Sequence, residues 1–268
     1  MGPALRSLIV TADDFGAHES VNEAVERGHV DGILTAASLM VGAPAAADAV
    51  ARARRLPRLG VGLHLVLVEG RPVLPPREIP DLVDASGCFR SDMVASAINI
   101  FLRPRARRQL AAEIEAQFAA FAATGLPLDH VNAHKHFHLH PTIAGTVLRV
   151  GRRFGMRAVR VPVEPGAGGI AAPFARALQR RLRRAGMTVP DQVYGLADSG
   201  RMTAARLGAI IAALPDGLSE IYLHPATRDD WPGNTAGYRY TDEFAALTTP
   251  ANRAAATTLN TARFITLA

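Results

Sequence analysis

Short apolar segments alternate with segments of helical periodicity along most of the chain, and this alternation constrains the fold more than any other feature. The apolar segments, which we predict to be strands, cover residues 5–11, 34–41, 59–68, 128–131, 158–161, 192–196, 218–223 and 264–267. The predicted helices cover residues 20–30, 45–56, 104–123, 142–154, 172–185, 203–214, 242–247 and 250–262. Strands that alternate with helices pair in parallel through right-handed crossovers. The sequence therefore predicts an α/β fold with about seven parallel strands.

One stretch, residues 69–101, interrupts the alternation. It contains four prolines, which disfavour regular structure, at Pro72, Pro75, Pro76 and Pro80. Long irregular segments inside a compact domain are usually functional. We expect an insertion or lid beside the functional site, within a single domain over residues 1–268.

Five of the nine histidines fall between His130 and His140. An extended chain would place alternate side chains on one face, whereas a helix would pair His134 with His130 and with His138. Either geometry gathers imidazoles, which bind metals and move protons near neutral pH. The alternative is a solvated polar loop. Because the cluster follows the predicted strand at 128–131, it lies where α/β folds carry their active sites.

Polar residues also lie at the ends of three other predicted strands. Asp13 and Asp14 follow the first strand, and they form either a metal or acid–base corner or a polar turn that caps a helix. His64 lies near the end of an apolar strand, and His224 directly follows another. Each of these two imidazoles is either a ligand or a structural histidine. In a barrel the strand ends converge on one face, which would bring these groups together.

Such a set of groups has a defined chemistry. One carboxylate and two imidazoles can hold a divalent ion with open coordination positions, which polarises a carbonyl and lowers the pKa of water toward about 7. A second carboxylate can then accept a proton, and a histidine can protonate the leaving group. These are the parts of a metal-assisted amide or ester hydrolase. Ligand softness favours zinc, cobalt or manganese over magnesium.

The chain carries a formal charge of +6, and because Lys135 is its only lysine, the basic residues are almost all arginine. A basic surface attracts anionic polymers and anionic lipid. A nucleic-acid-binding protein is therefore one alternative, although aromatic residues make up only 6% and no nucleic-acid motif is present. One cysteine, no secretory signal and no long apolar run predict a cytoplasmic protein.

Four motifs, in order along the chain, carry a resemblance to a known family: Thr11-Ala-Asp-Asp-Phe-Gly16, Gly62-Leu-His-Leu65, His130-x-Asn-x-His-Lys-His-x-His138 and Leu223-His-Pro225. They resemble the motifs of the YdjC-like carbohydrate deacetylases, which include chitooligosaccharide deacetylase. The resemblance extends from residue 5 to residue 247. It implies a deformed (β/α) barrel that uses a divalent metal to remove N-acetyl groups from amino sugars.

The resemblance also implies roles for individual residues. The metal would be bound by Asp14, His64 and His134, the general base would be Asp13, and the acid or transition-state stabiliser would be His224. The family suggests magnesium, so Mg²⁺ and Zn²⁺ both stay open. Many relatives carry Asp where this chain has Asn132, and a neutral amide cannot act as a base, which puts a catalytic role for this position in doubt.

Three further polar side chains of the cluster, Lys135, His136 and His138, are predicted to bind substrate. Segments 34–41 and 62–68 are most similar to the branch of the family associated with hopanoid biosynthesis. That similarity implies a membrane-anchored substrate, the N-acetylglucosaminyl headgroup of a hopanoid glycolipid. A metal-dependent phosphoesterase or another hydrolase on the same barrel is the alternative, because a fold does not fix the substrate.

Two segments favour peripheral contact with the inner face of a membrane. Phe174, Leu178 and Leu182 form an apolar stripe on an arginine-rich helix, and the apolar run 93–102 leads into further arginines. Basic amphipathic segments bind anionic lipid. The alternative is an ordinary amphipathic helix that packs its stripe on the barrel and exposes its arginines. The sequence predicts no oligomeric state.

Overall fold

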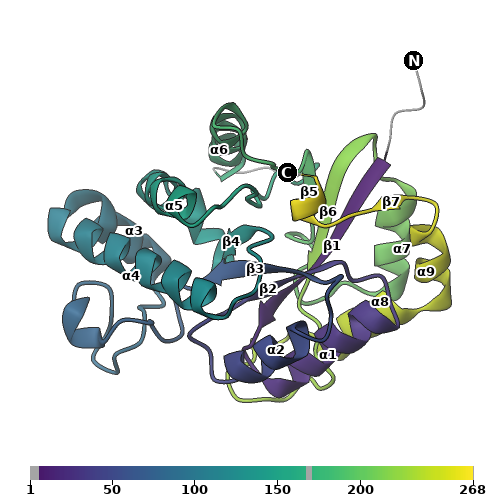
Figure 1. The fold of residues 1–268 in the computed structure, drawn as a ribbon, viewed down its shortest axis with the longest axis horizontal. Helices are drawn as coiled ribbons and strands as arrows, with labels where there is room; N and C mark the ends of the chain where they lie inside the picture. The colour runs from purple at the N-terminus through teal and green to yellow at the C-terminus, as the bar shows by residue number, and fades with distance from the viewer. Residues whose placement is uncertain (1–5, 167–170, 268) are drawn as a thin grey trace.

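The computed structural model describes residues 6–166 and 171–267, so Leu5 of the first predicted strand lies outside the described residues. Its centre is a parallel sheet in the order β4-β3-β2-β1-β6-β5, with β7 paired to β1 (Figure 1). The strands are β1 (Arg6–Phe15), β2 (Ala36–Leu39), β3 (Gly60–Leu65), β4 (Val131–Ala133), β5 (Gln192–Tyr194), β6 (Gly217–Leu223) and β7 (Asn260–Thr261). Every pair is parallel, as strands joined through helices require.

Helices surround the sheet, and short 3₁₀ segments lie in the connections. The α-helices are α1 (Glu19–Val30), α2 (Ala46–Ala53), α3 (Met93–Leu102), α4 (Pro104–Ala123), α5 (Pro141–Arg153), α6 (Ala171–Arg184), α7 (Ala204–Ala212), α8 (Tyr240–Thr248) and α9 (Pro250–Ala256). The 3₁₀ segments are η1 (Pro76–Glu78), η2 (His134–Leu139) and η3 (Phe264–Thr266). Helix α4 packs between α3 and α5, and α8 contacts α1, α7 and α9 (Figure 1). Among the described residues, no helix is both long and apolar enough to span a bilayer.

The sheet curves into a barrel that is completed by the segment 158–163. Val159 forms a parallel bridge with Val131 of β4, and Val193 of β5 donates its N–H to the carbonyl of Val163. Isolated contacts take the place of a continuous ladder on this side, so the barrel is irregular. The predicted deformed (β/α) barrel of parallel strands is therefore confirmed, while the predicted strand at 158–161 forms only isolated bridges.

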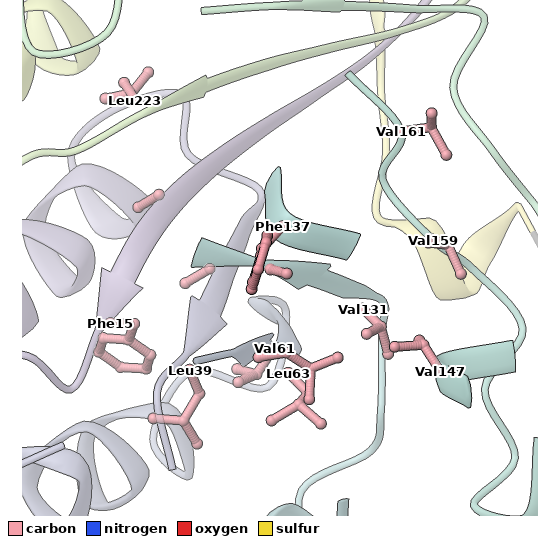
Figure 2. Packing of buried hydrophobic residues seen from close by; sticks show 14 of the residues in the cluster. Phe15, Leu39, Val61, Leu63, Val131, Phe137, Val147, Val159, Val161 and Leu223 are labelled. Carbon is pink, nitrogen blue, oxygen red and sulfur yellow. The ribbon is translucent and has the colours of Figure 1, made fainter. Parts of the chain in front are cut away.

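The strands are apolar because the sheet is covered on both faces. Residues Ser7–Asp13 of β1 are all buried, and so are all residues of β2, β3 and β4. Figure 2 shows side chains from several strands, from η2 and from α5 meeting in one core: Phe15, Leu39, Val61, Leu63, Val131, Phe137, Val147, Val159, Val161 and Leu223. This core fixes the strand ends from which the polar side chains project.

Two regions differ from the sequence prediction. The prolines of the insertion all precede residue 81, and the apolar run after them forms α3, so the insertion is not irregular throughout. At the end of the chain, the predicted helix stops at Ala256, β7 forms at Asn260–Thr261, and Phe264 turns into η3 instead of a strand. Phe264 is buried with its ring stacked on His130 at 4.6 Å, so it anchors the chain end without strand pairing.

Candidate active site

A bend at the carboxyl end of β1 brings two carboxylates to one side. Asp14 has a φ of 60°, and the register between β1 and β2 shifts between Ala12 and Phe15. Neighbouring side chains of a regular strand point to opposite faces. Asp14 has a left-handed conformation that breaks this alternation, so Asp13 and Asp14 both lie near His64 of β3.

Asp14, His64 and His134 form the one cluster of potential metal ligands found among the described residues. The Oδ1 atom of Asp14 lies 3.3 Å from Nε2 of His64 and 3.3 Å from Nδ1 of His134, and the two nitrogens are 3.4 Å apart. Asp14 Oδ1 is buried and has no hydrogen-bond partner in the described part of the chain. Three ligand atoms thus converge on one point, where a cation would satisfy all of them.

The spacing of these atoms also matches a metal. Tetrahedral coordination with bonds of about 2.0–2.1 Å separates ligand atoms by about 3.3–3.4 Å. Octahedral coordination with bonds of that length would separate them by about 2.9 Å. The observed separations of 3.3 to 3.4 Å agree with the tetrahedral case. The residues therefore fit a divalent ion.

Asn132 orients one of the ligands. Its Oδ1 lies 2.7 Å from Nδ1 of His64, and its Nδ2 donates to Asp13 Oδ1 at 3.1 Å and to Ser38 Oγ at 2.8 Å. Because a carboxylate can only accept, the amide nitrogen must face Asp13 and the amide oxygen must face His64. His64 then carries a proton on Nδ1 and leaves Nε2 available for the metal, the usual arrangement for ligand histidines. This contact gives Asn132 a role that needs no charge.

His130 belongs to the support of the site. Its Nε2 lies 2.9 Å from Ser38 Oγ and its Nδ1 lies 2.9 Å from Asp129 Oδ2, and the ring is fully buried. A continuous series of contacts thus runs from Asp129 through His130, Ser38 and Asn132 to His64. His130 therefore helps to hold Ser38 and Asn132 in place, and Asn132 in turn orients the ligand His64.

Sequence reasoning missed a buried ion-pair network beside Asp13. Arg160 Nη1 donates to Asp13 Oδ2 at 2.5 Å, and its Nε donates to Glu220 Oε1 at 2.8 Å. Thr11 Oγ1 donates to the same Glu220 oxygen at 2.7 Å. Burial by itself would raise the pKa of Asp13, but the Arg160 guanidinium, with His64 and His224 nearby, holds that pKa well below its usual range. Asp13 is therefore ionised and held in place.

A signal for this network was present in the sequence. Arg160 and Glu220 are charged residues in the middle of two predicted apolar strands, at 158–161 and 218–223. Charged residues are almost never fully buried unless they are paired. Opposite charges in two buried segments would have predicted that those segments face each other inside the barrel.

The other polar side chains of the histidine segment point to different partners and not to the ligand group. The segment is neither extended nor a regular helix, because Lys135 and His136 both adopt left-handed backbone angles, with φ of 51° and 54°. His136 Nε2 lies 2.9 Å from the Tyr222 hydroxyl, and Lys135 forms an ion pair with Glu69. Of the five clustered histidines, only His134 joins the ligand group.

His138 lies apart from the ligand group. It is buried, and its Nε2 contacts the backbone carbonyl of Arg160 at 2.8 Å. Burial, reinforced by the Arg160 charge, lowers its pKa to about 4, although the carbonyl contact opposes the shift. Its burial gives no support to the prediction that His138 binds substrate.

His224 lies on the β6 side of the site. Glu243 accepts the backbone N–H of His224, and the Nδ1 of His224 is 3.9 Å from Glu243 Oε2. The imidazole also packs edge-on against the rings of Tyr222 and Tyr238, with centroids 5.8 Å and 5.3 Å away. Its side chain is 12% exposed, so it is partly accessible from the mouth of the barrel.

A cavity of about 320 Å³ adjoins the site. Lys135 and His136 line it on the side of the histidine segment, together with His140, Glu164 and Arg176. The rest of the lining is apolar: Met93, Phe137, Leu139, Pro162, Val163, Ala172, Ala175 and Leu196. The cavity could therefore take an apolar group beside the ligand cluster.

Comparison with known proteins gives a consistent set of relatives. A carbohydrate deacetylase of Geobacillus stearothermophilus is 32% identical over 250 residues, which cover 91% of this chain and 90% of that protein. A human carbohydrate deacetylase is 32% identical over 83% of this chain and 75% of its own length. A crystal structure from Enterococcus faecalis V583, of a protein with a proposed role in cellobiose-phosphate cleavage, superposes with a TM-score of 0.82. It is 22% identical and covers 99% of this chain and all of its own, and so supports the fold alone.

The sequence profile of the YdjC-like proteins matches residues 7–257, a span that contains all four motifs and every residue of the ligand cluster. On this match the chain belongs to the YdjC-like protein family.

Proposed function

We propose that this protein is a metal-dependent hydrolase that removes the N-acetyl group from an amino sugar. One observation carries the proposal: Asp14, His64 and His134 present three ligand atoms 3.3 to 3.4 Å apart, next to a second, ion-paired carboxylate. The relatives named as carbohydrate deacetylases supply the substrate class.

Asp14, His64 and His134 would hold the ion, and such an ion supplies Lewis acidity that polarises a carbonyl and acidifies water. Asp13 is the proton acceptor. Its contact with Arg160 keeps it ionised and fixes the direction of its carboxylate, but the same contact makes it a weak base. A weak base is effective only toward a strongly acidified proton donor, so the role of Asp13 depends on the ion.

His224 is the group that protonates the leaving nitrogen. It reaches the site from β6, while Asp13 reaches it from β1, so an acid and a base can act on the same amide from two strands. Glu243 accepts the backbone N–H of His224 and lies 3.9 Å from its Nδ1, so the position of the imidazole is fixed from the side of α8.

The ligand set favours zinc over magnesium. Two of the three ligand atoms are imidazole nitrogens, which magnesium rarely accepts. The separations of 3.3 to 3.4 Å also agree with tetrahedral rather than octahedral geometry. We propose that the ion is zinc. Magnesium is the competing candidate, and a test of metal binding must include both ions.

The cavity beside the site supports a substrate with an apolar group attached to its sugar. Lys135 and His136 line this cavity and can contact the sugar, while most of the lining is apolar. The N-acetylglucosaminyl headgroup of a membrane-anchored hopanoid glycolipid fits this description. A phosphoesterase is less well supported, because Arg160 is fully buried and engaged by carboxylates, and Lys135 is paired with Glu69.

The test is acetate release from a glycolipid and from a chitooligosaccharide, both N-acetylated, in parallel reactions. We expect acetate from at least one substrate, loss of activity with a chelator, and recovery when zinc is restored. Phosphate release from phosphorylated sugars, with no acetate from any N-acetyl glycoside, would overturn the deacetylase proposal in favour of a phosphoesterase.

A further inference from the structure

Helix α3 has an apolar face that is largely exposed to solvent in the described structure. Its sequence, Met93–Leu102, contains no charged residue. Four large side chains point outward with high exposed fractions: Val94 at 70%, Ile98 at 54%, Phe101 at 60% and Leu102 at 65%. They fall at i, i+4, i+7 and i+8, which is one stripe of a helix. An apolar stripe on a helix is normally covered by another element.

This helix is fixed firmly to the protein by its other side. Ser96 and Ile100 are buried, and Asn99 donates from Nδ2 to the carbonyl of Asp81 at 2.8 Å. The side chain of Asp92 caps the first turn by accepting the N–H of Ala95. The exposed stripe is therefore a property of a well-packed helix.

Helix α6 behaves in the opposite way, and this corrects the prediction that its stripe faces a membrane. Leu178 and Leu182 are buried, with exposed fractions of 7% and 3%, so the stripe packs on the protein and the arginines face solvent. Of the three stripe residues, only Phe174, near the start of the helix, is strongly exposed. The alternative of an ordinary amphipathic helix describes α6, and α3 carries the free apolar surface.

Basic residues border the α3 stripe. Arg103, Arg107 and Arg108, where α3 ends and α4 begins, are exposed, and none of them has a carboxylate within 4.0 Å in the described part of the chain. Arg90 and Arg103 also line a surface cavity of about 380 Å³ that Ile98 and Leu102 border. An apolar stripe beside unpaired arginines is complementary to a surface that is apolar inside and anionic at its edge.

We propose that α3 is the docking surface for an anionic lipid bilayer, with its stripe in the acyl region and its flanking arginines at the phosphate groups. The helix also borders the substrate cavity: Met93 lines that cavity, and the Phe101 ring packs edge-on against His140, another lining residue, at 6.3 Å. Docking through α3 brings the cavity next to the lipid. The docking surface does not depend on the proposed deacetylation.

The experiment is flotation of the full-length protein with vesicles of phosphatidylcholine alone and of phosphatidylcholine with phosphatidylglycerol, without substrate or metal. We expect binding to the anionic vesicles that weakens as salt is raised. Arg103→Glu with Arg107→Glu should weaken binding at least about tenfold, while Arg58→Glu, a reversal at an exposed arginine before β3, should not.

The apolar half of the surface is tested separately. Ile98→Asp with Phe101→Asp should abolish binding, and Val30→Asp, at a side chain 63% exposed on α1, should leave it unchanged. Thermal melts show which variants are folded. If the aspartate variants are unfolded, the arginine variants still test whether α3 and its flanking residues bind the vesicles. Equal binding to neutral and anionic vesicles, or full binding by the arginine variants, would overturn the proposal. The proposal would also be overturned if the protein bound no vesicles but formed a dimer that Phe101→Asp dissociates. A second copy of the chain would then be the partner of α3.

Discussion

The two aspartates at the end of β1 are adjacent in the chain, yet their surroundings differ. Asp13 is buried, and its two oxygens accept hydrogen bonds from Arg160 and from Asn132. Asp14 is partly exposed, and its Oδ1 faces two imidazole nitrogens with no hydrogen-bond donor assigned to it among the described residues. The first carboxylate is satisfied by the protein itself. The second has an oxygen with no hydrogen-bond donor in the described part of the chain, as the proposed metal site requires.

This difference separates the side of the site that is held by ion pairs from the side that is open to a cation. On the ion-paired side, Arg160 joins Asp13 to Glu220 across the inside of the barrel. On the open side, Asp14 converges with His64 and His134 on the position that a cation would take. Mutations on the ion-paired side should therefore affect stability and turnover, and mutations on the open side should affect metal binding.

The largest expected effect is on the ion-paired side. Arg160→Met would leave two buried carboxylates without their partner, which should lower the free energy of unfolding by about 3–5 kcal/mol. The matched control is Arg153→Met. Arg153 also bonds a carboxylate with two nitrogens, that of Glu115, but both side chains are exposed, so the loss should stay within about 1 kcal/mol. Urea unfolding of both variants measures the contrast, and equal losses would remove the structural role of the buried network.

Asp13→Asn sharpens the comparison between the two aspartates. The amide keeps most of the shape but cannot accept the proton, so turnover should fall on the order of a hundredfold or more. Metal content should stay at the wild-type level, because Asp13 is not among the three converging ligands. A variant that loses its metal would show that the roles of the two aspartates are reversed.

A smaller effect is expected on the pH dependence of stability, and it comes from His138, a buried histidine outside the ligand group. Because the pKa of His138 is about 4 in the folded protein and 6.5 is the ordinary value, the unfolded chain takes up a proton first as the pH falls. The contribution to stability is complete above pH 6.5 and is lost progressively toward pH 4, with about 2 kcal/mol lost between pH 8 and pH 5.

His138→Gln keeps a donor for the Arg160 carbonyl but does not titrate in this range, so its stability should depend less on pH. The control is His29→Gln, since His29 also contacts a backbone carbonyl, that of Leu34, but is only half-buried. Urea unfolding at several pH values gives the free energy of unfolding of wild type and of both variants as the pH falls. An unchanged acid sensitivity in His138→Gln would show that other groups cause it.

The strand ends could be predicted from the sequence because a parallel sheet gathers them at one edge. Asp14, His64 and His134 follow or end three different strands, and the structure brings them within hydrogen-bonding distance of one another. The bends at Asp14, Lys135 and His136 could not be predicted in the same way. Residues other than glycine seldom adopt a positive φ, and nothing local in the sequence requires it here.

The ion-pair network was missed for a different reason. Arg160 and Glu220 are 60 residues apart, and Arg160 lies in a segment that bridges its neighbours without forming a regular strand. Periodicity assigns residues to elements, but it does not say which elements face each other across a barrel. The apolar run that forms α3 could be seen in the sequence. Its exposure could not, because exposure depends on how α4 and α6 pack.

The metal content of three proteins tests the central claim most directly. Wild type, His134→Ala and His138→Gln would each be loaded with zinc, dialysed and analysed for metal, in parallel with magnesium. We predict one zinc ion per chain in wild type and in His138→Gln, and little in His134→Ala, because only His134 of these two lies in the ligand group. Equal metal in wild type and His134→Ala would contradict the account, since the three converging atoms would then not be what holds the ion.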